Sequence, residues 1–226
     1  MSNSKTFYGI NEEYFANTNC IHTAEEIALQ PIIWNRLGKI LQSKKSEISD
    51  FMEKLGNIGD VRVIFTGAGS SAFIGDALAP LIMKSSGIKA ESIHTTDIVS
   101  CPECFLLRET PTLLVSFARS GNSPESVGAV EYARAAIDNL FEIAIVCDGT
   151  SNLYNLTAKS TDSLILVMPE GSCDKGFAMT SSVTAMLLSG FALFNLDKID
   201  ELVRDIATLS ENVSDSGLLF TELASK

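Results

Sequence analysis

The spacing of apolar residues changes from a helical period to a strand period near residue 60. Between residues 24 and 57 apolar side chains recur every three or four positions, for example at Ile27, Trp34 and Leu41. Gly56 and Gly59 end this stretch. We therefore expect an N-terminal helical arm over residues 1–58, followed by a region of a different architecture.

Beyond this arm, short β-rich runs alternate with helical patterns. Strands are predicted at Val61–Thr66, Ala90–His94, Thr112–Phe117, Glu142–Val146 and Ser163–Met168, and helices at 72–86, 123–137, 151–158, 180–196 and 197–211. Strands that alternate with helices at this spacing indicate an α/β fold, in which a parallel sheet is covered on both faces. We expect one domain over residues 59–212, and a linker or frayed tail over 213–226.

Three of the predicted strand ends lead into loops rich in glycine and hydroxyl groups, and ligands of open parallel sheets bind at such ends. The first loop is Gly67-Ala68-Gly69-Ser70-Ser71. Its glycines let the backbone approach a ligand, and the helix that follows offers free N–H groups to an anion. A tight turn in which Ser71 caps the helix explains this loop equally well.

The second loop, Ser116 to Ser126, lies between a strand and a helix that begins with Pro124. Ser120 and Ser123 can donate to phosphate oxygens, and Arg119 adds a charge or pairs with a carboxylate. A helix cap at Ser123 explains only part of this loop, since it gives no role to Ser120 or Asn122. A third loop, Gly171 to Ser182, precedes an apolar helix that Thr180 could cap.

The strings FTGAGSSAFIGD, SFARSGNSPESVGAVEYA and KGFAMTSSVTAML, which contain these loops, resemble SIS (sugar isomerase) domains. They look like the branch of tagatose-6-phosphate ketose/aldose isomerases and galactosamine-6-phosphate deaminases. The resemblance implies a three-layer α-β-α sandwich with a five-stranded parallel sheet, which binds a phosphorylated sugar. It implies that Ser71, Ser120 and Ser123 hold the phosphate. The expected substrate-binding residues are Gly69, Ser70, Ser71, Arg119, Ser120, Gly121, Asn122, Ser123, Phe177, Ala178 and Met179.

Members of this branch carry two SIS domains in one chain, with the catalytic Glu and His in the second. This sequence has only His22 and His94, and neither lies in a family motif. We therefore expect it to correspond to the first half of such an isomerase or deaminase, and no catalytic residue is assigned. A sugar-phosphate-sensing module without catalysis is the alternative from another functional class. The resemblance implies no metal or organic cofactor.

Composition narrows the range of partners. The net charge of −11 makes nucleic acid and anionic membranes poor partners. Five scattered cysteines and no signal-peptide pattern indicate the cytoplasm. The segment Thr180 to Leu196 is apolar around most of its circumference and must be buried on several sides. The arm adds more apolar surface, since Trp34 would be exposed if the arm is unpaired. Together, the arm and this segment predict a homo-oligomer.

Other motifs support weaker alternatives. Gly67 to Ala72 matches a relaxed dinucleotide fingerprint, for which Glu91 or Asp97 would bind the ribose. Cys101-Pro102-Glu103-Cys104 has the spacing of a redox motif or half a zinc site, but no second ligand pair is evident. Asp76 and Glu125 are the acids nearest the expected site, and either could serve as a base. Glu125 more simply stabilises the start of its helix.

Overall fold

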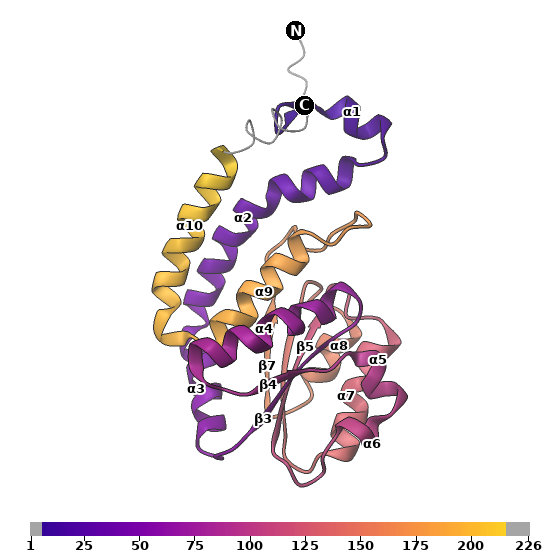
Figure 1. The fold of residues 1–226 in the computed structure, drawn as a ribbon, viewed down its shortest axis with the longest axis vertical. Coiled ribbons are helices and arrows are strands. Elements are labelled where there is room, and N and C mark those ends of the chain that lie inside the picture. The colour runs from indigo at the N-terminus through magenta and orange to yellow at the C-terminus, as the bar shows by residue number, and fades with distance from the viewer. Residues whose placement is uncertain (1–5, 216–226) are drawn as a thin grey trace.

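The chain folds around one parallel β-sheet, which a computed structural model describes for residues 6–215, with side chains to residue 212. The five strands lie in the order β4-β3-β5-β6-β7, with helices on both faces (Figure 1). The α/β fold, the five-stranded sheet and the three layers expected from the sequence are therefore confirmed. The sheet strands are β3 (Arg62–Gly67), β4 (Ala90–Ser92), β5 (Thr112–Ala118), β6 (Leu140–Val146) and β7 (Ser163–Val167).

Side chains alternate between the two faces of this sheet, and two separate apolar clusters result. Phe65 and Phe117 belong to one cluster, with α4 (Ser70–Ser86) and α9 (Ser181–Leu193). Ile64 and Leu114 belong to the other, whose helices are α5 (Thr95–Ser100), α6 (Pro102–Phe105), α7 (Pro124–Ala136) and α8 (Asn152–Thr157). Because both faces are covered, the central strands are mainly apolar, with a few buried polar residues such as Thr66, Ser116 and Glu142.

The N-terminal arm packs onto the first of these faces. It consists of α2 (Ile21–Ser43) and α3 (Lys45–Gly56), and α10 (Ile199–Asp215) runs beside α2 (Figure 1). A side chain at Gly38 would place its Cβ 3.1 Å from Val203, so the glycine allows α2 and α10 to approach closely. Helix α2 packs against α9, and α10 packs against α2.

The arm is paired within the chain, so the exposure of Trp34 that an unpaired arm would cause does not occur. Only 8% of its surface is accessible, and its indole nitrogen donates to the hydroxyl of Thr184 on α9, 3.0 Å away. The chain therefore covers α9 with its own arm, as well as with α4 and the sheet. The apolar circumference of α9 does not by itself require a second copy of the chain.

Several element boundaries differ from the predictions. Helix α4 begins at Ser70, two residues early, and α9 ends at Leu193, where a 3-10 turn (Leu196–Lys198) leads into α10. Helix α10 extends to Asp215, so the predicted tail begins later than residue 213, and residues 216–226 lie outside the described part. The short elements β1 (Thr6–Phe7), β2 (Ile10–Asn11), α1 (Glu12–Asn17), α5 and α6 were not predicted, because such short stretches show no period. Within residues 6–215, no helix is both long and apolar enough to cross a membrane.

Candidate functional site

A cavity of about 200 Å³ opens at the carboxyl ends of β3 and β5. Strands β4 and β5 are the two neighbours of β3 in the sheet. The chain runs from β3 to β4 on one side of it and then returns to β5 on its other side. This reversal is the point where open α/β sheets bind ligands. All three glycine-rich or hydroxyl-rich loops contribute to the wall, which is lined by Ala68, Ser71, Phe117, Ala118, Arg119, Ser120, Gly121, Ser123, Ser126 and Met179.

The first loop is shaped by Gly67 and Gly69. A Cβ on Gly67 would lie 2.7 Å from the backbone of Ser71, and Gly69 adopts a positive φ of 56°. Both positions therefore favour glycine. Ser71 is the second residue of α4 and is not its N-cap, so the capping role suggested by the sequence is wrong. Its buried side chain lines the cavity instead.

The second loop combines a helix cap with cavity-lining groups. The hydroxyl of Ser123 accepts the N–H of Ser126 at 3.3 Å, which confirms Ser123 as the cap of α7. Gly121 has a φ of +61°, and a Cβ there would lie 2.5 Å from the hydroxyl of Ser151. Asn122 accepts the N–H of Asn152 at 2.9 Å and so connects this loop to the start of α8.

The third loop is held by Asp174, which the sequence did not single out. Its buried carboxylate accepts the N–H groups of Thr180, Ser181 and Ser182 at 3.2, 3.0 and 2.9 Å, and so caps α9 from six residues upstream. The side chain of Thr180 occupies the N-cap position but does not cap the helix; its hydroxyl donates to Asp174. Arg119 donates to the carbonyl of Asp174 at 3.2 Å, so its partner is a backbone oxygen.

Glu26 on α2 is a second residue that local patterns did not reveal. One oxygen of its buried carboxylate accepts the N–H groups of Lys175 and Gly176, the latter at 2.9 Å. The contact joins residues 149 positions apart, and a period-based analysis contains no signal for it. Phe177 follows directly and is fully exposed at the tip of the loop.

The structure brings six of the eleven predicted site residues to the cavity wall: Ser71, Arg119, Ser120, Gly121, Ser123 and Met179. The other five, Gly69, Ser70, Asn122, Phe177 and Ala178, lie in the same three loops without lining it. Ser126 also lines the wall and was not predicted. It lies one helical turn after Ser123, with which it shares a hydrogen bond of 2.8 Å.

The cavity wall carries a positive group but no base. Arg119 is the one ionisable residue among the described residues that line it. Neither Asp76 nor Glu125 lines the cavity. A carboxylate oxygen of Asp76 lies 3.6 Å from Nε2 of His94 instead. Burial raises the pKa of the neighbouring Cys147 thiol well above its ordinary value, so this thiol stays protonated. The wall can bind an anion, but it offers no group for moving protons.

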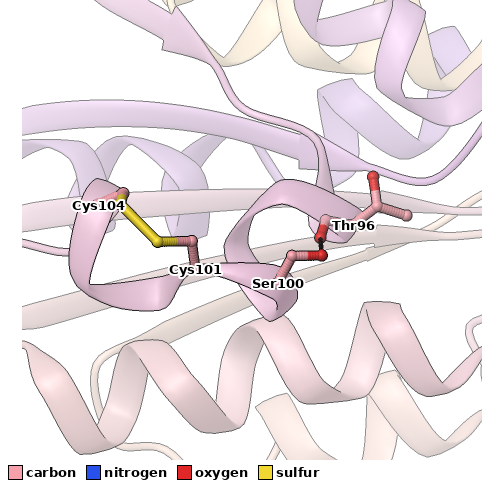
Figure 2. Close-up of a disulfide and its surroundings, with 4 residues drawn as sticks. All are labelled: Thr96, Ser100, Cys101 and Cys104. Carbon is pink, nitrogen blue, oxygen red and sulfur yellow. Dashed lines mark hydrogen bonds between the residues drawn. A yellow bond between two sulfur atoms is a disulfide. The ribbon is translucent and has the colours of Figure 1, made fainter.

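The residues of two alternative motifs bind other groups of the chain and do not line the cavity. Cys101 and Cys104 are joined as a disulfide at the start of α6 (Figure 2), and neither of them lines the cavity. Glu91 binds the guanidinium of Arg62 through both oxygens, at 2.8 and 3.0 Å, which leaves it poorly suited to hold a ribose. In the described part of the chain, no three His, Cys, Asp or Glu side chains gather closely enough to hold a metal ion.

Comparison with known proteins relates this geometry to a family. Residues 59–196 match the SIS domain. The chain is 41% identical, over 82% of its length, to the D-galactosamine-6-phosphate deaminase AgaS of Escherichia coli. It spans about half the length of the curated relatives it matches, 48% in that case.

Solved structures agree with this relationship. A Clostridium novyi NT protein, provisionally assigned as a tagatose-6-phosphate ketose/aldose isomerase, has 39% identity and a TM-score of 0.91, over 98% of this chain and 56% of that one. The tagatose-6-phosphate ketose/aldose isomerase of Escherichia coli has 36% identity and a TM-score of 0.83. The match covers 91% of this chain and 55% of that one. Since the family match covers more than half of the chain, and the fold and loop motifs agree with it, the chain belongs to the SIS domain family.

Proposed function

We propose that this chain is the sugar-phosphate-binding half of a ketose/aldose isomerase or amino-sugar-phosphate deaminase. The cavity at the β3–β5 switch point is the observation that carries the proposal. Ser71, Ser120 and Ser123 stand at its wall, and Arg119 supplies a positive charge in a chain whose net charge is −11. Hydroxyl donors and a guanidinium are groups suited to phosphate oxygens.

The proposed binding set is larger than this wall. It comprises the eleven residues from Gly69 to Met179 named above, with the apex of the third loop facing the sugar part of the ligand. The phosphate would be held by the first two loops. The relatives named as galactosamine-6-phosphate deaminase and tagatose-6-phosphate isomerase support a six-carbon sugar phosphate as the ligand class.

Catalysis requires groups that the described cavity wall does not contain. Aldose–ketose isomerisation moves a proton between adjacent carbons and needs a base near them. The polar side chains of the described wall are hydroxyls and one guanidinium, and none of them is a base suited to this step. We therefore propose that the acid and base come from a second SIS half or from a second copy of the chain. The same observation favours the second candidate, a sugar-phosphate-sensing module without catalysis.

Titration calorimetry tests the binding proposal. Galactosamine 6-phosphate and tagatose 6-phosphate should bind, and galactosamine without phosphate should bind far more weakly. Ser120→Ala should weaken binding of the phosphates by about 1–3 kcal/mol, the usual range for a lost hydrogen bond to a charged group. Its melting temperature should hardly change, because the hydroxyl of Ser120 makes only a long contact of 3.4 Å with the N–H of Asn122. Equal affinity for the phosphorylated and the free sugar would contradict the proposal.

An isomerase and deaminase assay separates the two candidates. The chain alone should bind the sugar phosphate without turning it over. Adding a second SIS half should restore turnover if the chain belongs to an enzyme. A sensing module would show binding in both conditions and turnover in neither.

We further propose a cytoplasmic protein that self-associates. Three of the five cysteines, Cys20, Cys147 and Cys173, are unpaired, which supports a reducing compartment. The disulfide between Cys101 and Cys104 is the feature that points the other way, and such a compartment would keep it reduced. Self-association is supported by Phe73, Leu81 and Met83 on α4, large apolar side chains that are 62, 44 and 47% exposed. The proposed organisation is an arm over residues 1–58 and a sugar-phosphate domain over 59–212, with α10 continuing to Asp215. Light scattering at micromolar concentration checks the oligomer, and a monodisperse monomer of 24.3 kDa would contradict it.

A further inference from the structure

The third loop is fastened on both sides of its apex by carboxylates. On one side, Glu26 accepts the N–H groups of Lys175 and Gly176. On the other, Asp174 accepts the N–H groups at the start of α9. Between these two attachments lie only Phe177, Ala178 and Met179, the last of which lines the cavity. The path of this apex therefore depends on both carboxylates.

Glu26 reaches the loop from outside the matched family region. It lies on α2 in the N-terminal arm, whereas the SIS match begins at residue 59. Its backbone carbonyl also accepts the hydroxyl of Ser181, at 2.8 Å, so this one residue binds the loop both before and after the apex. The arm and the sugar-phosphate domain are thus connected at the rim of the candidate site.

The fit around Glu26 is close. Only 8% of the residue is exposed, and within the described part of the chain its second carboxylate oxygen has no hydrogen-bond partner. A Cβ on Gly176 would lie 2.8 Å from that oxygen, so glycine allows the carboxylate to sit directly beneath the loop. Burying a charged oxygen without a partner is costly. An apolar side chain in this place would leave the N–H groups of Lys175 and Gly176 without an acceptor, so the carboxylate is the group that holds the loop next to its apex.

We propose that Glu26 is a positioning residue for the sugar part of the ligand, and that the N-terminal arm thereby forms part of the binding site. This inference rests on the proposed function. The first and second loops, which hold the phosphate, make no contact with Glu26 among the described hydrogen bonds. Loss of Glu26 should therefore loosen the apex of the third loop and leave the phosphate subsite as it was.

Two probes and three variants test the proposal. Affinities for galactosamine 6-phosphate and for inorganic phosphate are measured by NMR titration with the full chain. Glu26→Ala should lose at least tenfold in affinity for the sugar phosphate and stay within twofold for inorganic phosphate. Glu26→Gln keeps one oxygen that can accept both N–H groups, so it should recover most of the loss. Glu25→Ala is the matched control, since its side chain is 40% exposed and lies 3.9 Å from His22.

Amide hydrogen exchange supplies an independent readout. Lys175 and Gly176 should exchange faster in Glu26→Ala, while the amide of Ser126 in the second loop should be unchanged. A variant that binds the sugar phosphate as the wild type does, or that loses affinity for both probes equally, overturns the positioning role. If the wild type binds neither probe, the proposed function fails instead. If Glu26→Ala does not fold, Glu26→Gln tests the proposal in its place. An amide oxygen accepts weaker hydrogen bonds than a carboxylate, so this variant should lose about threefold in affinity for the sugar phosphate and none for inorganic phosphate.

Discussion

Replacing Asp174 with alanine should destabilise the fold more than any nearby surface change. The carboxylate accepts five hydrogen bonds: three from the N–H groups of Thr180, Ser181 and Ser182, and two from the hydroxyls of Thr180 and Ser182. Asp174 itself is 4% exposed, and both serines are fully buried. Water therefore cannot easily replace the missing acceptor.

The expected magnitude follows from the groups left without a partner. A buried donor that loses its acceptor costs about 1–3 kcal/mol, and a lost helix cap costs about 0.5–2 kcal/mol. Some relaxation of the loop will restore part of these bonds. We expect Asp174→Ala to lower the free energy of unfolding by about 3–5 kcal/mol. Asp174→Asn keeps the shape and one acceptor, but it turns an NH₂ group toward the N–H donors, so about half of that loss is expected.

Urea unfolding followed by fluorescence measures this loss. Trp34 is the single tryptophan of the chain and packs between α2 and α9, so its emission reports on the helix that Asp174 caps. Asp200→Ala is the control, because Asp200 is exposed. Its surface pair with Lys45 at 3.0 Å and its place in the first turn of α10 are each worth at most about 1 kcal/mol. If Asp174→Ala stays within about 0.5 kcal/mol of this control, the carboxylate does not hold α9 in the way described.

Three further changes probe other parts of the structure. Ser123→Ala removes the cap of α7, so it should cost about 1 kcal/mol of stability and should also weaken sugar-phosphate binding. A melting temperature equal to that of the wild type would contradict the cap. Gly190→Ala would place a Cβ 2.4 Å from the side chain of Leu78, and overpacking of this kind should cost about 1–3 kcal/mol in urea unfolding. The hydrogen bonds from Arg62 lower the pKa of the Glu91 carboxyl in the folded chain. The pair therefore stabilises the fold at any pH above the ordinary glutamate pKa. This stabilisation is lost as the pH falls through the lower pKa of the folded chain. Arg62→Met should reduce the difference in urea midpoint between pH 7 and pH 3, and an unchanged difference would refute the assignment.

The sheet was predictable because its signals are local. Each strand is a short apolar run bounded by turn residues, and the order of strands and helices along the chain indicates a parallel sheet. Helix α7 was equally readable, since Ser123 and Pro124 are local markers of a helix start. The helix cap at Ser71 was a reasonable prediction from the same kind of marker. It failed because the backbone turns at Gly69, so the helix begins one residue before Ser71.

Part of the candidate site was predictable because local motifs mark the first two loops. Gly121 and Ser123 carry local signals, a glycine at positive φ and a serine that caps the helix after it, and both line the cavity. The third loop is different, because its shape depends on Glu26, 149 positions before Lys175. In a periodicity analysis Glu26 is simply one acid on a helix with many polar positions.

Long-range contacts of this kind also explain why the arm was misread as an exposed surface. Trp34 and Thr184 are 150 positions apart, and the sequence provides no indication that their side chains meet. Once α2 covers α9, the apolar character of α9 is accounted for within one chain. The case for self-association must then rest on α4, whose residues Phe73, Leu81 and Met83 remain exposed. Replacing Phe73 and Leu81 with polar residues should therefore shift an oligomer toward monomer, whereas the equivalent change on α9 should unfold the chain. Sedimentation velocity measures the first outcome, and an oligomer that persists in the α4 double variant would place the contact elsewhere.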